Sequence, residues 1–197
     1  MKLIIASNNN HKVREIKEIL ENHFTDICSQ KEAGVVLEVV EDGSTFQENA
    51  IKKAEQTLLQ AKEFDAALAD DSGLIVDALD GAPGVYSARF AGEEHDDAAN
   101  NRKLLEMMQD VPEEQRTCRF ASAVALARRG KETLCVMGYC EGKLLRENHG
   151  ENGFGYDPLF YYEPAKKSFA ELSAEEKNHV SHRRCALERL QALLEKE

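Results

Sequence analysis

The sequence contains no apolar run of the roughly 20 residues that a membrane-spanning helix needs. Its N-terminus has one lysine followed by four apolar residues before it turns polar, so we expect a first strand there rather than a signal peptide. Internal repeats, low-complexity tracts and linkers are also missing. The sequence therefore predicts a single globular chain in the cytoplasm with no membrane partner.

Cysteine pairs and positive charge are scarce as well. The five cysteines are scattered, with no CxxC pair and no histidine at zinc-like spacing, so we expect reduced thiols and no structural zinc. The 25 Lys and Arg residues against 36 Asp and Glu give a net charge of −11. Because phosphate backbones are bound by clustered cations, this argues against a nucleic-acid partner. A small phosphorylated ligand, held by a few lysines and Mg²⁺, remains compatible.

The remaining composition indicates an α/β protein. With 197 residues, 42% apolar and 31% charged, the chain is long enough for one domain over residues 1–197 with two lobes. Strand patterns alternate with helix patterns, and a long hairpin follows, which favours a mixed central sheet. We expect strands at 2–6, 35–40, 66–69, 74–76, 116–127 and 133–146. We expect helices at 12–22, 45–63, 96–108 and 179–194, with capping boxes at Thr45/Glu48 and Ser173/Glu176.

The stretch 66–90 carries the strongest chemical signal. A buried strand is expected to end in two adjacent carboxylates, Asp70 and Asp71, followed by a tight turn at Ser72-Gly73. Neighbouring carboxylates repel unless a cation or a shared proton offsets them, and such pairs are typical of Mg²⁺ sites and general bases. An ordinary Asp-Asp-Ser-Gly turn is the alternative.

Other segments supply candidate ligand groups. The polar turn 7–11 precedes a helix, and helix N-termini bind anions, with Lys12 adding a charge; the P-loop pattern is absent, and a capped turn is the alternative. Lys53, on the helix expected at 45–63, is a candidate for contact with a bound anion. The alternative is an ordinary solvated lysine. The loop 150–158 interleaves glycines with two aromatic rings, which suits stacking on a base or a tight aromatic turn. Lys177, His182 and Arg183 cluster near the start of the last helix, where positive charges oppose the helix dipole. Such a local conflict is typical of a functional site.

Five segments in register resemble the inosine/xanthosine triphosphate pyrophosphatase family. They are Ser7-Asn8-Asn9-Asn10-His11-Lys12; the run from Glu41 to Ala50; Ala69 to Leu74 with Pro83 to Arg89; Gly153 to Pro158; and Glu176 to Arg183. They span residues 1 to about 190. The resemblance implies an ITPase-like, anticodon-binding-like α/β fold, with a mixed sheet, flanking helices and two lobes around a cleft. It also implies a homodimer.

The resemblance further implies a role for each matched position. The phosphate loop would be Ser7, Asn8, Asn9, Asn10, His11 and Lys12, reached also by Lys53. Glu41 and Asp71 would be the Mg²⁺ ligands, Asp71 the catalytic base, and Ser72 a substrate contact. The base-binding residues would be Phe154, Gly155, Tyr156 and Asp157, with Phe154 stacking on the purine, and the further nucleotide contacts would be Lys177, His182 and Arg183. Asn8 replaces a common glycine, and His11 a small residue.

The reaction implied is Mg²⁺-dependent hydrolysis of a non-canonical purine nucleoside triphosphate (ITP, dITP or XTP) to the monophosphate and pyrophosphate. Two alternatives use the same residues. One is a Mg²⁺-dependent phosphatase that releases orthophosphate from nucleotides or sugars. The other is a nucleotide-binding module without turnover, which would have no need of a water-activating base.

Overall fold

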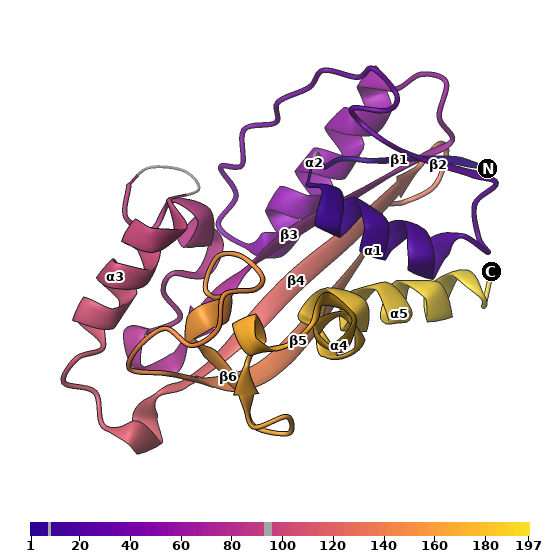
Figure 1. Ribbon diagram of the computed structural model, residues 1–197. Helices are drawn as coiled ribbons and strands as arrows, with labels where there is room; N and C mark the ends of the chain where they lie inside the picture. Colours follow the sequence, from indigo (N-terminus) through magenta and orange to yellow (C-terminus); the bar gives the residue numbers. More distant parts are fainter. Residues whose placement is uncertain (8, 93–95) are drawn as a thin grey trace. The chain divides into compact units, whose positions relative to one another are not determined.

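A seven-stranded sheet in the order β2-β1-β3-β4-β5-β6-β7 forms the frame of the computed structural model, which describes residues 1–7, 9–92 and 96–197 (Figure 1). The strands are β1 (Lys2–Ile5), β2 (Asp26–Ser29), β3 (Ala66–Val76), β4 (Thr117–Arg128), β5 (Leu134–Leu144), β6 (Phe160–Tyr162) and β7 (Lys167–Ser168). The helices are α1 (Asn10–Leu20), α2 (Phe46–Gln60), α3 (Asp97–Met107), α4 (Ala174–Val180) and α5 (His182–Leu194). Strand β1 is parallel to β2 and β3, whereas β6 is antiparallel to β5 and β7. The predicted mixed α/β class is confirmed.

The chain divides into two compact units. The first comprises Met1–Asp71, Ser122–Gly138 and Arg183–Glu197, and the second comprises Ser72–Ala121 and Tyr139–His182. Strands β3, β4 and β5 each contribute residues to both units. Each unit has its own apolar core.

The core of the first unit lies between the sheet and the helices α1 and α5 (Figure 1). Side chains alternate between the two faces of a strand, and on β3 it is Ala66 and Leu68 that enter this core. The members from β1, α1, β4 and α5 are Leu3, Ile5, Val13, Ile16, Leu20, Val124, Leu126, Ala186, Leu187 and Leu190. The same alternation directs Asp70 toward α1 and α5.

Helix α2 covers the opposite face of β3, because Asn49 on α2 contacts Asp71. Its start is fixed by the predicted capping box, in which Thr45 accepts from the Glu48 amide and Glu48 accepts from the Thr45 amide. The Ser173/Glu176 box at α4 is confirmed in the same way.

The second unit is built around packed aromatic rings. The ring centroid of Phe160 lies 4.6 Å from those of both Phe120 and Phe169. The His182 ring stacks on Phe120, with ring centroids 5.0 Å apart. Such contacts add to the burial energy of the rings and fix β4, β6 and the start of α5 within this unit.

Two expectations about strands are wrong. Residues 35–40 form no strand: Val36 is 99% exposed and Val40 is 69% exposed, so these β-prone residues have no sheet to bury them. The strand beside β1 is instead β2, whose four residues pair in register with β1.

The predicted turn at Ser72-Gly73 is also absent, because β3 continues through both residues to Val76. Its Leu74 amide donates to Ser87 Oγ at 2.9 Å, and its apolar residues are buried in both units. Tertiary pairing thus overrides the turn preference of these residues. The last helix begins later than expected, since Ser181 is extended and separates α4 from α5. Over the described residues, none of the helices has the length and apolar character needed to cross a membrane.

Arg116 provides a test of the second unit's stability. It is 1% exposed, and its guanidinium donates to the carbonyls of Leu144 (2.9 Å), Met108 (2.6 Å) and Leu145 (2.9 Å). We expect Arg116→Met to lower the free energy of unfolding in urea by about 3 kcal/mol, because three carbonyls lose a charged donor. The exposed Arg146, which donates to two carbonyls nearby, is the control. Arg146→Met is expected to cost under about 1 kcal/mol, and equal losses would contradict this account.

Candidate active site

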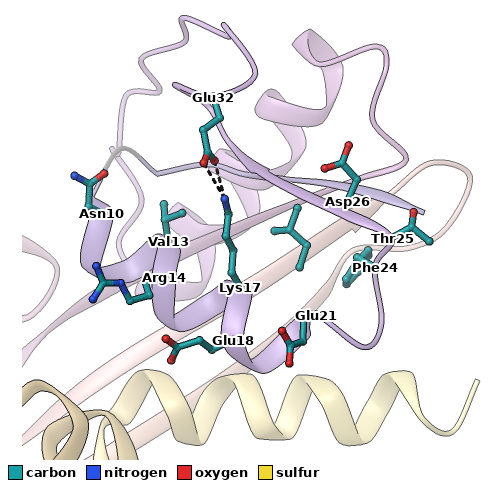
Figure 2. A pocket seen from close by; sticks show the side chains of 11 residues that line it. Asn10, Val13, Arg14, Lys17, Glu18, Glu21, Phe24, Thr25, Asp26 and Glu32 are labelled. Carbon is teal, nitrogen blue, oxygen red and sulfur yellow. Dashed lines mark hydrogen bonds and ion pairs between the residues drawn. The ribbon is translucent and has the colours of Figure 1, made fainter.

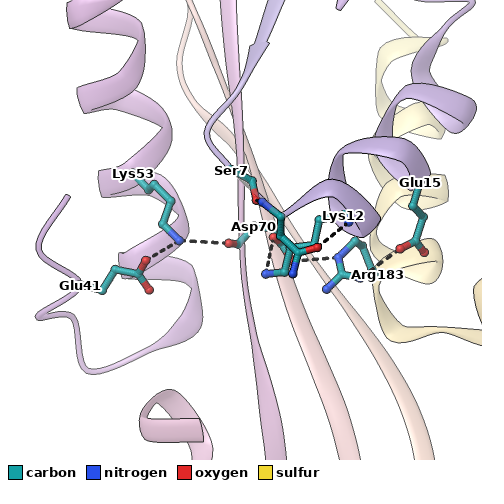
Figure 3. Close-up of polar contacts among 8 residues, drawn as sticks. Ser7, Lys12, Glu15, Glu41, Lys53, Asp70 and Arg183 are labelled. Carbon is teal, nitrogen blue, oxygen red and sulfur yellow. Dashed lines mark hydrogen bonds and ion pairs between the residues drawn. The ribbon is translucent and has the colours of Figure 1, made fainter. Parts of the chain in front are cut away.

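Asp70 lies at the centre of a buried ion-pair network in the first unit (Figure 3). Its Oδ1 accepts from Lys12 Nζ at 2.8 Å, and its Oδ2 accepts from Arg183 Nε at 3.0 Å. Arg183 Nη1 donates in turn to Glu15 Oε2 at 3.0 Å. The Asp70 side chain is 1% exposed. Two cations and two carboxylates therefore connect α1, β3 and α5 in a place from which water is nearly excluded.

The pKa shifts of the cations reflect this burial. Burial lowers the pKa of Lys12, and the charges of Arg183 and Lys53 lower it further, while Asp70 opposes the change. Burial would also lower the pKa of Arg183, but Asp70 and Glu15 outweigh it and raise that pKa. The carboxylates thus raise the pKa of Arg183, whereas for Lys12 the effect of burial outweighs the attraction of Asp70.

Asp71 faces the other side of the strand, away from the network at Asp70. Its Oδ2 accepts from Asn49 Nδ2 at 3.0 Å, and Asn49 is 1% exposed. The Asn49 oxygen accepts from the Gly43 amide at 2.7 Å, which turns the amide nitrogen toward Asp71. Residue 43 must be glycine here, since a Cβ would lie 2.6 Å from that oxygen.

The pKa of Asp71 is raised to about 6. Burial is the largest cause, and the charges of Glu41 and Asp70 add to it, while Asn49 and Lys53 act in the opposite direction. Lys53 is itself held by Glu41, with Nζ 2.5 Å from Oε1, and donates to the Asp70 carbonyl at 3.3 Å. The positive charge near the buried Asp71 carboxylate is therefore too small to offset the effect of burial on its pKa.

Glu41 and Asp71 are suited to share a cation. The Glu41 carboxylate is close enough to raise the pKa of Asp71, and a divalent cation would remove this repulsion. No group of three or more His, Cys, Asp or Glu residues in the described part of the chain is arranged to hold a metal. Two carboxylates are a donor set that suits Mg²⁺, which is commonly bound by one or two carboxylates, with waters and substrate phosphates completing the shell.

The predicted phosphate loop lies at the start of α1, whose Lys12 enters the network at Asp70. Ser7 Oγ accepts from the Asn9 amide at 3.1 Å, and Asn9 Oδ1 accepts from the Lys12 amide at 3.2 Å. Asn9 thus caps the helix. Asn8 and the side chain of His11 lie outside what the structure describes, and Ser72 is half-buried on β3, next to Asp71.

A hollow of about 590 Å³ lies elsewhere on the first unit (Figure 2). It borders α1 and β2, and its lining includes Asn10, Arg14 and the ion pair of Lys17 with Glu32 at 2.9 Å. Apart from Asn10, none of the predicted site residues lines it. Its size alone does not make it the nucleotide site.

The predicted base-binding residues gather in the second unit. Asp157 Oδ2 accepts from the Phe154 amide at 2.9 Å and from Lys177 Nζ at 2.5 Å. Lys177 Nζ lies 4.5 Å from the centroid of the Phe154 ring, which is 43% exposed. Residue 153 has φ +79°, and a Cβ there would lie 2.1 Å from Asp157 Oδ2, so only glycine fits.

The remaining members of this set are less exposed. Tyr156 is buried, and its hydroxyl donates to the Ser87 carbonyl at 2.8 Å. His182 is buried against Phe120. Arg183 belongs to the first unit, where two of its nitrogens bind Asp70 and Glu15.

The sequence alone assigns no role to Glu15 or Asn49, and it treats Asp70 and Asp71 as one carboxylate pair. Strand alternation instead gives the two carboxylates different partners. Glu15 has a recognisable signal, since it is a charge beside the apolar positions Val13 and Ile16 of an amphipathic helix. Asn49 has none, because its role depends on contacts with residues distant in sequence.

Comparisons with known proteins identify the family of this chain. The Ham1 family model matches residues 3–193. The chain belongs to the Ham1 family. A relative from Desulforamulus reducens named dITP/XTP pyrophosphatase is 53% identical over 196 residues, covering 98% of this chain and 96% of the relative. One of the same name from Bacillus subtilis is 49% identical over 192 residues, with 98% and 96% covered.

Solved Ham1 structures have the same fold. The HAM1 protein from Coxiella burnetii is 40% identical, with a TM-score of 0.90 and complete coverage of both chains. The Staphylococcus aureus Ham1 protein is 41% identical, with a TM-score of 0.88, and 100% of this chain and 99% of that chain are covered.

Neutralising the two adjacent carboxylates is expected to change stability in opposite directions. Asp70→Asn should lower the free energy of unfolding by about 3 kcal/mol, because it leaves Lys12 and Arg183 without their shared counter-charge. Asp71→Asn should raise it by about 1–3 kcal/mol in metal-free buffer at pH 8, because a buried charge is removed while the Asn49 contact is retained. Urea unfolding with a chelator present measures both, and a loss of stability in both variants would contradict the assignment.

The gain from Asp71→Asn depends on pH with a defined sign. The folded protein holds a proton on Asp71 up to about pH 6, whereas the unfolded chain releases it near the ordinary aspartate pKa of 3.8. Wild-type stability contributed by this group is therefore lost as pH rises between these values. The advantage of the variant should be absent at pH 3.5, grow up to about pH 6 and stay constant above it.

Proposed function

We propose that this chain hydrolyses non-canonical purine nucleoside triphosphates, such as ITP, dITP and XTP, to the monophosphate and pyrophosphate. Its membership of the Ham1 family and the names of its relatives support this activity. The observation that carries the proposal is Asp71, a buried carboxylate with a pKa of about 6, beside Glu41 and Lys53. An ordinary folded protein gains nothing from such a group, whereas a site that binds a metal and activates water uses it.

Mg²⁺ is the cofactor that we propose, with Glu41 and Asp71 as its protein ligands. When bound, it would neutralise phosphate charge and lower the pKa of a coordinated water. Lys53 already lies against Glu41, so it is placed to bind a phosphate oxygen near the same carboxylates.

The chain's own groups account for the rest of the reaction. Asp71 takes the proton of the attacking water as the water bonds to the α-phosphorus and the bond to the leaving pyrophosphate breaks. Lys12 and Lys53 stabilise the charge that develops on that leaving group. The loop from Ser7 to Lys12 leads into α1, and the positive end of the dipole of that helix would attract the phosphates.

Base recognition rests on the residues around Phe154. Its exposed ring is available to stack on a purine, and Lys177 lies over the same ring. We propose that His182 and Arg183 donate to the 6-keto group of hypoxanthine or xanthine, where adenine has an amino donor. A site that depends on one substrate hydrogen bond rejects an analogue lacking it by up to about 10⁴-fold. Guanine shares the keto group, and this contact does not reject it.

We propose in addition that residues 1–197 act as one two-lobed domain and that the chain is a cytoplasmic homodimer with no nucleic-acid or membrane partner. The dimer is supported by the family resemblance. The cytoplasmic location is supported by five cysteines that are all free thiols, and the absence of a nucleic-acid partner by the net charge of −11.

The substrate and the bond that is cleaved can be tested together. Steady-state assays with ITP, XTP, GTP and ATP and with Mg²⁺ should measure pyrophosphate and orthophosphate separately. We expect pyrophosphate as the first product, formed from ITP and XTP orders of magnitude faster than from ATP. Orthophosphate as first product would point to a general phosphatase instead, and equal rates on all four nucleotides would contradict the proposed base selection.

The catalytic role of Asp71 predicts a large loss of turnover. Asp71→Asn should fold normally and lower kcat by about 10²-fold or more, because the base and a metal ligand are lost together. Asp77, an exposed aspartate just beyond β3 that pairs with Arg119, is the matched control, and Asp77→Asn should retain kcat. Substantial turnover by Asp71→Asn would remove Asp71 from the mechanism.

A further inference from the structure

Helix α3 holds the loop that carries Phe154, although no motif assigned it a role. Asp97 Oδ2 accepts from the Gly155 amide at 2.7 Å, and Asn101 Nδ2 donates to the Gly155 carbonyl at 3.0 Å. The two side chains are four residues apart, so they lie on one face of the helix. Both polar groups of one loop residue are thus bound from a single turn of α3.

Gly155 is the residue at which such a hold has the largest effect on the loop. It has φ +63°, a left-handed conformation that few other residues adopt. A Cβ there would meet nothing within 4 Å, so backbone conformation and not space demands the glycine. Glycine also has more backbone freedom than any other residue. Fixing the peptide groups on both sides of it therefore fixes the direction of the neighbouring Phe154.

Other contacts hold the residues on either side of Gly155. Asp157 binds the Phe154 amide, and Tyr156 is anchored through its hydroxyl to Ser87. Neither of these contacts involves the amide or the carbonyl of Gly155. Asn101 is 6% exposed, and burying an asparagine is costly unless it makes hydrogen bonds. Its contact with Gly155 satisfies the amide nitrogen, whereas its Oδ1 has no hydrogen-bond partner in the described part of the chain.

We propose that Asp97 and Asn101 are positioning residues that preorganise the base-binding loop through Gly155 and so set the affinity for the purine. This inference rests on the proposed function. Preorganisation lowers the entropy lost when the ligand orders a loop. The reacting groups, Asp71 and the two lysines, belong to the first unit, so the clamp should act on the binding of the base and leave the chemical step unchanged.

Two isosteric exchanges one turn apart give a sharp test, because Asp97 must accept a hydrogen bond and Asn101 must donate one. Asp97→Asn retains an acceptor oxygen, and we expect a KM for ITP within about twofold of wild type. Asn101→Asp places a carboxylate against the Gly155 carbonyl, and we expect KM to rise about tenfold. In both variants kcat should stay within about twofold of wild type, since the effect is on ground-state binding.

Inhibition by inorganic pyrophosphate separates positioning from damage to the fold, because it probes the phosphate residues without a base. Its inhibition constant should not change in Asn101→Asp. Asn100, also buried on α3, binds the backbone at Ala88 and Ala91 instead, so Asn100→Ala is the matched control and should retain the KM. Should Asn101→Asp fail to fold, the exposed Asp97 provides the test, with a KM about fivefold higher expected for Asp97→Ala.

The outcomes are distinguishable. A wild-type chain that releases no pyrophosphate from ITP would overturn the proposed function. An active wild type, with Asn101→Asp or Asp97→Ala at the wild-type KM, would overturn the clamp and leave the function standing. Equal losses in KM, kcat and pyrophosphate inhibition would also overturn it, since they would indicate general damage.

Discussion

The buried ion pairs of Asp70 are the interaction on which the first unit's site depends. Lys12 and Arg183 both bind this carboxylate, and Glu15 supplies the second negative charge. Breaking such a pair leaves an uncompensated charge where water cannot reach it, which costs several kcal/mol. Asp70 therefore fixes α1 and α5 on the sheet and, through Lys12, fixes the end of the proposed phosphate loop.

Because side chains alternate along a strand, the next residue, Asp71, lies on the opposite face and has different neighbours. Asp71 has a neutral amide, Asn49, as its hydrogen-bond partner and another carboxylate, Glu41, nearby. Its raised pKa is a local cost to the fold, and such costs are typical of sites arranged for a ligand that is yet to bind. Two adjacent aspartates thus have different surroundings: Asp70 holds the structure together, and Asp71 is the one that we propose for the chemistry.

Much of the fold was predictable because its signals are local. The capping box at Thr45 and the strand–helix alternation need only neighbouring residues. The four-residue β2 and the continuation of β3 through Ser72-Gly73 depend on pairing between distant segments, which residue preferences do not encode. The same limit applies to the site: motif resemblance singled out Glu41 and Asp71 as candidates, whereas the partners of Asp70 and the contacts of Gly155 with α3 depend on how the helices pack.

The central claim is that the pKa of Asp71 stays raised until a cation binds to Asp71 and Glu41. Carboxyl ¹³C NMR, with the Asp71 signal identified from its loss in Asp71→Asn, measures this directly. The account predicts a pKa of about 6 for Asp71 in metal-free protein and a fall well below that value when Mg²⁺ is added. A pKa near 4 without metal, or a raised pKa that Mg²⁺ leaves unchanged, would contradict it.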